Sequence, residues 1–239
     1  MLAAEPMLPV AILAGGLATR MRPMTQTIPK ALIDVAGEPF LRRQLRYLSA
    51  QGVVDVVLCV GYLSEQIEAE FADGAALGLR LRYVRDGEKL LGTGGALRGA
   101  LGLLGDSFFV LYGDSFLPIQ FAPVLTAFFQ SRMPALMTVL HNQGRWDASN
   151  VEFSGGRVLE YNKRTPNPRM QHIDYGLGIL SAAPLLAYPK DQAFDLADLY
   201  HDLSGRGQLA GYEVTQRFYE IGSPAGLADT IAYFGQQPR

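Results

Sequence analysis

The glycine-rich segment near the N-terminus contains residue types that bind phosphate groups. Gly15 and Gly16 are consecutive, so backbone N–H groups can approach phosphate oxygens without a Cβ in the way. Arg20 and Arg22 can add charge-assisted hydrogen bonds, and Lys30 supplies a further cation. A solvent-exposed turn would explain the paired glycines but not the whole string. The segment differs from the ATPase P-loop, since no Gly-Lys pair with a following Ser or Thr is present, and from the G-x-G-x-x-G dinucleotide loop.

A carboxylate in the middle of the chain could hold a metal ion next to these phosphates. Asp114 follows Gly113 directly after the apolar run 108–112. Because hard cations prefer oxygen ligands, a carboxylate at a strand end can bind Mg²⁺ against phosphate oxygens. The alternative role for Asp114 is the capping of a turn or helix.

The glycine loop and Asp114 must be positioned by the elements that precede them. The runs 10–14, 53–60 and 108–112 are predicted to be buried strands, 79–84 alternates like a further strand, and 40–51, 64–71 and 95–104 are predicted helices. This alternation is typical of a doubly wound parallel sheet, in which ligands bind beyond the carboxyl ends of the strands. Gly15 and Asp114 both fall at such ends.

The second half of the chain reads as a more strand-rich part of the same unit. Strands are predicted over 135–141, 151–153, 157–161, 173–180 and 216–221, and helices over 195–203 and 224–234. Gly155 and Gly156 are predicted to form a hairpin turn. No composition shift marks a linker, so we expect a single domain over 1–239, with one half at about 8–134 and a second half at about 135–235.

The string from Leu13 to Pro23, extended by 24–25 and by Pro29-Lys30, resembles the signature of the sugar-1-phosphate nucleotidyltransferases. The string departs from this signature at Ala18, where the family has a third glycine. Alanine has a narrower range of φ than glycine. The resemblance implies a Rossmann-like mixed α/β sheet flanked by helices, of the nucleotide-diphospho-sugar transferase type, with a smaller sugar-binding lobe. It implies that the half at about 8–134 binds the nucleotide and that the half at about 135–235 binds the sugar phosphate. It also implies an enzyme that converts a nucleoside triphosphate and a sugar 1-phosphate to a nucleotide sugar and pyrophosphate.

The resemblance further implies a role for individual residues. Arg20, Lys30 and Asp114 would be catalytic; Leu13, Ala14, Gly15, Gly16, Thr19, Glu88, Gly92 and Thr93 would bind the nucleotide; Asn150, Asn162, Lys163, Asp174 and Gly176 would bind the sugar phosphate; Asp114 and Glu220 would hold Mg²⁺. The cluster 92–95 would line the base pocket, although it could also simply begin a helix. Trp146 either packs near the sugar or closes the lobe.

The resemblance leaves the substrates open. The segments 112–115, 173–176 and 218–224 look most like the short bacterial mannose- or manno-heptose-1-phosphate guanylyltransferases of cell-surface polysaccharide synthesis, which favours GTP and a manno-configured sugar phosphate. The opening loop also resembles the muramate-1-phosphate uridylyltransferases, and thymidylyl or cytidylyl transfer stays open. Because Ala18, Asn162 and Glu220 depart from the family pattern, a catalytically silent protein that binds nucleotide sugars is an alternative of another class.

Bulk properties narrow the remaining function classes. The net charge of -2, with no long run of one sign, disfavours binding to nucleic acid. The single cysteine, Cys59, excludes a disulfide within the chain, which fits a reducing compartment. No apolar stretch reaches the roughly 18–20 residues of a membrane span, and no signal peptide is evident, so we expect a cytoplasmic protein with no membrane partner. The three histidines have no zinc-ligand spacing, and the oligomeric state is not indicated.

Overall fold

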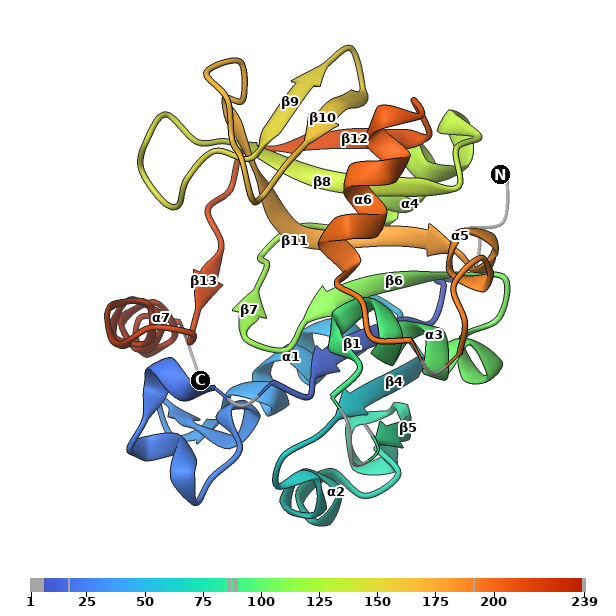
Figure 1. Cartoon of the computed structure of the whole chain (residues 1–239). Coiled ribbons are helices and arrows are strands. Elements are labelled where there is room, and N and C mark those ends of the chain that lie inside the picture. The colour runs from blue at the N-terminus through green and yellow to red at the C-terminus, as the bar shows by residue number, and fades with distance from the viewer. Residues whose placement is uncertain (1–6, 17, 86, 88–89, 191, 238–239) are drawn as a thin grey trace, which may run out of the picture.

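The computed structural model describes residues 7–16, 18–85, 87, 90–190 and 192–237. Within these residues, a main sheet of nine strands has the order β5-β4-β1-β6-β11-β8-β12-β10-β9 (Figure 1). Its strands are β1 (Val10–Ala14), β4 (Asp55–Val60), β5 (Arg80–Arg85), β6 (Ser107–Tyr112), β8 (Ala135–His141), β9 (Val151–Ser154), β10 (Arg157–Tyr161), β11 (His172–Ser181) and β12 (Leu209–Val214). A single sheet therefore runs through both predicted halves.

Helices and short ladders surround this sheet. The α-helices are α1 (Phe40–Ala50), α2 (Ser64–Phe71), α3 (Gly92–Leu104), α4 (Phe121–Ser131), α5 (Ala182–Leu186), α6 (Leu196–Gly205) and α7 (Pro224–Gly235). Short 3-10 turns cover Thr19–Met21, Met24–Gln26, Lys30–Leu32 and Ala75–Leu77. Two separate ladders pair β2 (Asp34–Val35) with β3 (Glu38–Pro39) and β7 (Ser115–Phe116) with β13 (Tyr219–Glu220). None of the described helices combines the length and apolarity needed to cross a bilayer.

The first four strands of the main sheet, β1, β4, β5 and β6, are parallel, which confirms the arrangement predicted from their alternation with helices. β1 pairs in parallel with β4 and β6, and β4 pairs in parallel with β5. Val10 and Ile12 face a core shared with α1, α2 and α4, whereas Ala11 faces a second core shared with α3, α5 and α6. Because helices cover both faces, every position of a central strand must be apolar.

The second half makes the sheet mixed, as the resemblance implied. β11 runs antiparallel to both β6 and β8, whereas β12 is parallel to β8. β9 and β10 form the predicted hairpin, in which Gly155 and Gly156 have φ of 57° and 76°. Positive φ at two consecutive turn residues is what a tight hairpin requires and what glycine tolerates best.

The structure differs from the sequence predictions in several elements. The late strand predicted over 216–221 reduces to the two residues of β13, because only Tyr219 and Glu220 have a partner strand. Strand β12, helices α4 and α5, and the short strands β2, β3 and β7 were not predicted. Gly211 interrupts the apolar pattern of β12, and it is required there because a Cβ would collide with the Phe153 ring. Helix α4 was missed because it contains Pro123, and proline usually argues against a helix. Pro123 lies in the first turn of α4, where proline is tolerated.

Gly61, directly after β4, offers a test of how tightly β4 supports the glycine loop. A Cβ at Gly61 would lie 2.6 Å from the carbonyl oxygen of Gly15, so Gly61→Ala must displace one of these two backbones. We expect a loss of about 1–3 kcal/mol in the free energy of unfolding, measured by urea denaturation. Gly102→Ala, on the exposed face of α3 with nothing within 4 Å, is the matched control and should gain about 0.5–1 kcal/mol. Wild-type stability for Gly61→Ala would contradict the prediction.

Candidate active site

A cavity of about 270 Å³ opens at the carboxyl ends of β1 and β6. It brings together eight of the predicted site residues: Leu13, Ala14, Gly15, Gly16, Lys30, Gly92, Thr93 and Asp114. No heavy atom lies within 4 Å of the Cβ position at Gly16, so the loop is open toward this space. Thr19 is not part of the cavity wall, and Glu88 lies outside the described residues.

A second cavity, of about 570 Å³, adjoins the first and shares Tyr112 and Asp114 with it. Its wall includes seven predicted site residues: Arg20, Asp114, Asn150, Lys163, Asp174, Gly176 and Glu220. The predicted nucleotide and sugar-phosphate residues thus line two different spaces that meet at Asp114. Arg20 borders the second cavity, together with the carboxylates of Asp114 and Glu220. Tyr112, which lines both cavities, was not singled out in the sequence.

The Asp114 carboxylate forms an ion pair with Lys30, with Nζ and Oδ2 2.7 Å apart. Both side chains are mostly covered, at 21% and 28% exposed, so solvent screens this pair less than a surface pair. Gln44 of α1 stabilises the turn at 112–115, which contains Asp114. Its Nε2 donates to the carbonyl oxygens of Tyr112 (3.1 Å) and Ser115 (2.7 Å). The sequence does contain a signal for Gln44, because it is a polar residue on the predicted buried face of its helix.

The β7–β13 ladder brings Glu220 next to Asp114. Glu220 pairs with Ser115, and the Ile221 N–H donates to the Asp114 carbonyl at 2.9 Å. The Glu220 carboxylate accepts hydrogen bonds from the Ser223 hydroxyl, at 2.5 Å, and from the Gly222 N–H. These donors fix the orientation of the carboxylate.

The two carboxylates and Arg20 converge on one point. The Cβ position of Gly222 lies 2.8 Å from Oε2 of Glu220, 3.2 Å from Oδ2 of Asp114 and 3.4 Å from Nη2 of Arg20. The described residues contain no cluster of three or more His, Cys, Asp or Glu that could hold a metal ion. Two carboxylates suit Mg²⁺ when substrate phosphates supply most of the remaining ligands. The donor set therefore fits the predicted ion.

The loop that carries Arg20 is anchored despite its departure from the family pattern. Ala18 adopts the left-handed conformation, with φ 48° and ψ 39°, which costs a residue with a Cβ roughly 1–2 kcal/mol. Its carbonyl oxygen accepts from the buried hydroxyl of Thr25 at 2.9 Å and from the Met21 N–H at 3.0 Å. Ala18 thus takes a conformation that glycine would adopt without strain.

The sequence left open whether the cluster 92–95 lines a pocket or begins a helix. In the structure it does both, because Gly92 and Thr93 line the first cavity and helix α3 begins at Gly92. A Cβ at Gly92 would lie 2.6 Å from the Phe194 carbonyl oxygen, which instead accepts from the Gly94 N–H at 3.0 Å. The Thr93 hydroxyl donates to Asp195 Oδ1 at 2.8 Å. The glycines therefore allow close packing of α3 against the segment before α6.

In the wall of the second cavity, hydrogen bonds connect Asn150, Asp174 and Gly176. Asn150 Oδ1 accepts from the Asp174 N–H, and Asp174 Oδ1 accepts from the Gly176 N–H, both at 3.0 Å. Burial raises the pKa of the Asp174 carboxyl, and the Gly176 N–H and the charge of Lys163 offset part of this rise. These contacts fix the part of the cavity wall that Asn150, Asp174 and Gly176 form together with Lys163.

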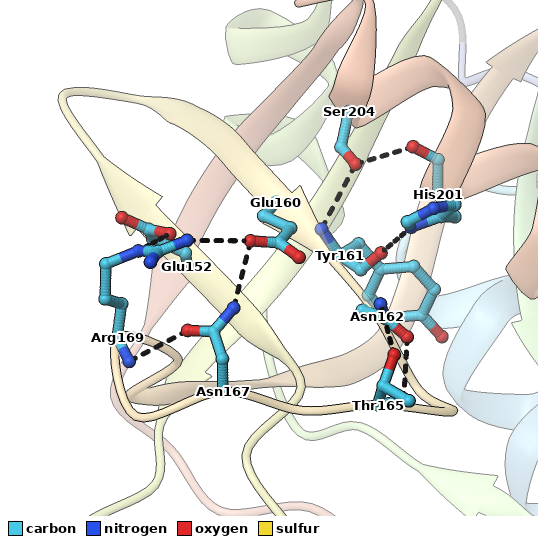
Figure 2. A network of polar contacts seen from close by, with 9 residues as sticks. All are labelled: Glu152, Glu160, Tyr161, Asn162, Thr165, Asn167, Arg169, His201 and Ser204. Atoms are coloured by element: carbon cyan, nitrogen blue, oxygen red, sulfur yellow. Dashed lines mark hydrogen bonds and ion pairs between the residues drawn. The ribbon is translucent and has the colours of Figure 1, made fainter.

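Asn162 does not line the cavity, although a sugar contact was predicted for it. Its Oδ1 accepts from the Arg164 N–H at 3.1 Å. The same oxygen accepts from the Thr165 N–H at 2.9 Å, and the Asn162 Nδ2 donates to the Thr165 hydroxyl (Figure 2). The Asn162 side chain is thus used to fold the turn that contains Lys163. Its sugar contact stays a prediction.

The rest of the segment 162–171 is tied to its neighbours by a polar network (Figure 2). Arg169 pairs with Glu152 (2.9 Å) and Glu160 (3.1 Å), and the Asn167 amide donates to Glu160 at 3.0 Å. At the start of the segment, the carbonyl of Tyr161 accepts from Nδ1 of His201 at 2.7 Å. Each exposed pair contributes little alone, but together they restrict the loop that presents Lys163.

A family model and several known proteins match most or part of this chain. The family model described as MobA-like NTP transferase domain matches residues 10–217. The chain is 28% identical over 236 residues to a mannose-1-phosphate guanylyltransferase of Mycobacterium tuberculosis, covering 95% of this chain and 66% of that protein. It is 40% identical over 121 residues to an N-acetylmuramate alpha-1-phosphate uridylyltransferase of Neisseria meningitidis, covering 50% of this chain and 51% of that protein.

The chain thus spans about two thirds of the length of the first relative and about half of the second. Among solved structures, HddC from Yersinia pseudotuberculosis, complexed with GMP-PN, has a TM-score of 0.79 at 24% identity, covering 95% of this chain and 100% of that chain. This likeness shows a common fold.

The raised pKa of Asp174 predicts a pH-dependent effect on stability. A carboxyl whose pKa is higher in the folded state than in the unfolded state favours folding while protonated, and this contribution is lost as pH rises through the folded-state pKa. Asp174→Asn does not titrate, so its Tm relative to wild type should increase from about pH 4 toward neutral pH. Asp106→Asn, at the exposed opposite end of β6, is the control. A Tm difference that is independent of pH would contradict the prediction.

Proposed function

The chain belongs to the MobA-like NTP transferase domain family, and from this premise we propose that it joins a nucleoside triphosphate to a sugar 1-phosphate with release of pyrophosphate. The observation that carries the proposal is the pair of adjoining cavities that share Asp114. Lys30 borders one cavity, and Arg20 and Lys163 border the other. Two anionic substrates can therefore meet at one carboxylate with cations on both sides.

In this proposal the nucleoside occupies the first cavity. The wall there is mainly apolar and backbone, from Leu13–Gly16 and Gly92, which suits a base and ribose. The triphosphate extends across Asp114 toward Arg20, whose guanidinium can bind phosphate oxygens with two parallel hydrogen bonds. Lys163 holds the phosphate of the sugar 1-phosphate in the second cavity, so that this phosphate faces the α-phosphorus.

The reaction is a direct displacement at the α-phosphorus. An oxygen of the sugar phosphate, already ionised near neutral pH, forms a bond to the α-phosphorus. The bond from the α-phosphorus to the oxygen that bridges to the β-phosphate breaks, and pyrophosphate leaves with the electron pair. No protein nucleophile is required, so Lys30 and Arg20 act by aligning the groups and by offsetting charge.

Asp114 and Glu220 are the residues that would hold Mg²⁺. The bound ion would neutralise charge on the triphosphate and restrict its orientation. When a cation and substrate arrive, Lys30 can exchange its ion pair with Asp114 for a phosphate oxygen, since Nζ has three donors. The lysine thus compensates the Asp114 charge before binding and substrate charge afterwards.

GTP with a manno-configured sugar 1-phosphate is the favoured pair. It is supported by the likeness to the mannose-1-phosphate guanylyltransferase, which extends over 95% of this chain. The alternative is UTP with N-acetylmuramate 1-phosphate or a related hexose 1-phosphate, supported by a higher identity over half of the chain.

Pyrophosphate release, measured for a grid of nucleoside triphosphates against sugar 1-phosphates with Mg²⁺, tests the reaction and identifies the substrates. We expect one strongly active combination, with GTP and mannose 1-phosphate first. In that combination Asp114→Asn should lose at least about a hundredfold in turnover while remaining folded, because one charge at the reacting centre is removed. Asp106→Asn should match wild type. No release from folded protein that still binds nucleotide would contradict the proposal and favour the silent binding protein.

Lys163→Ala tests whether the two substrates bind in different cavities, because it should change the KM of only one of them. Loss of a charge-assisted hydrogen bond to the sugar phosphate should raise the KM for sugar 1-phosphate about tenfold or more and leave the KM for the nucleotide nearly unchanged. Lys190→Ala, an exposed lysine that does not border either cavity, is the control. An equal rise in both KM values would remove Lys163 from the sugar-phosphate site.

A further inference from the structure

Trp146 lies in the wall of the sugar-side cavity and has no part in the mechanism above. It is the sole tryptophan of the chain, and 40% of its surface is exposed. Exposed large aromatic surface that borders a cavity is typical of a ligand contact, because burial on binding removes apolar area from water.

The backbone of Trp146 is fixed by a buried amide. Asn142 is 1% exposed, and its Oδ1 accepts from the Trp146 N–H at 3.1 Å. Its Nδ2 donates to the Asp147 carbonyl at 2.6 Å and to the Ser149 hydroxyl at 3.0 Å. The connection between β8 and β9 is thereby folded around the Asn142 side chain, which fixes the backbone from which the indole extends.

The indole itself is held by Arg217. The guanidinium lies 4.4 Å from the Trp146 ring centroid and 4.6 Å from that of Tyr219, so it contacts both rings. Asp229 of α7 fixes it further through an ion pair of 3.0 Å. Phe218 packs against the indole, with ring centroids 6.1 Å apart. The charge of Arg217 is therefore used within the protein, and its planar group serves as a support.

We propose that Trp146 is a stacking platform for the pyranose ring of the sugar 1-phosphate, and that Arg217 is the residue that positions it. This inference rests on the proposed function. A pyranose has an apolar C–H face that an indole can cover, and its hydroxyls need acceptors. Asp147 and Asp174 border the same cavity and supply them, while Lys163 holds the phosphate. The substrate class is accordingly a sugar with an intact six-membered ring.

Steady-state kinetics distinguish this platform from a residue that only closes the lobe. Trp146→Ala should raise the KM for the sugar 1-phosphate about tenfold, the factor that corresponds to ~1.4 kcal/mol, with little change in the KM for the nucleotide. Trp146→Phe should recover most of the loss, because it keeps an aromatic face. Phe129→Ala, a 46% exposed aromatic on α4, is the matched control and should behave as wild type. A lower Tm with an unchanged sugar KM would overturn the proposal.

The single tryptophan supplies a direct binding signal. Mannose 1-phosphate, or the sugar 1-phosphate that gives turnover, should change the wild-type emission with a midpoint near its KM, and inorganic phosphate, which lacks the ring, should not. Arg217→Lys keeps the charge but loses the planar support, so it should raise the sugar KM about threefold and shift the emission of the free protein. Turnover without any sugar-dependent emission change would overturn the platform and leave the reaction intact. Absence of turnover with every pair would instead overturn the proposed function.

Discussion

The parallel pairing of β1 with β6 is the contact on which the site depends. It aligns Leu13 with Tyr112, and the next residue, Gly113, donates its N–H to the Leu13 carbonyl at 2.9 Å. A Cβ at Gly113 would lie at the same 2.9 Å from that oxygen, so only glycine allows the two strand ends to approach so closely. The glycine loop and Asp114 are thereby brought side by side.

Charge compensation is the second condition that the arrangement meets. Two carboxylates and an arginine converge on one point, and without compensation the carboxylates would repel each other and the phosphates they are to meet. Lys30 neutralises Asp114, and N–H and O–H donors around Gly222 and Ser223 hold Glu220. The protein thus stabilises the two carboxylates through an ion pair and hydrogen bonds, and these contacts can be exchanged for contacts with a cation.

The fold and the core of the site could be predicted because they depend on local patterns. Gly15, Gly16 and Asp114 follow apolar runs, and the parallel order of these runs fixes where their ends meet. Contacts between distant segments could not be predicted in this way. Gln44 acts on a turn about seventy residues later in the chain, and Asn162 uses its amide within its own turn because three local partners are within reach. A strand of two residues such as β13 has no periodicity at all; only its partner β7 defines it.

The sheet order has a consequence for the sequence of events during folding. Strand β12 lies between β8 and β10, although it follows both in the chain. Strand β10 can therefore pair with β12 only after β12 has been synthesised, whereas β9 pairs with β11, which precedes β12 in the chain. Asp114 meets Glu220 later still, when β13 pairs with β7. Such non-local pairings form slowly because a long loop must close before any contact rewards it. During synthesis on the ribosome, the parallel half can form early, whereas the complete site is assembled among the last steps.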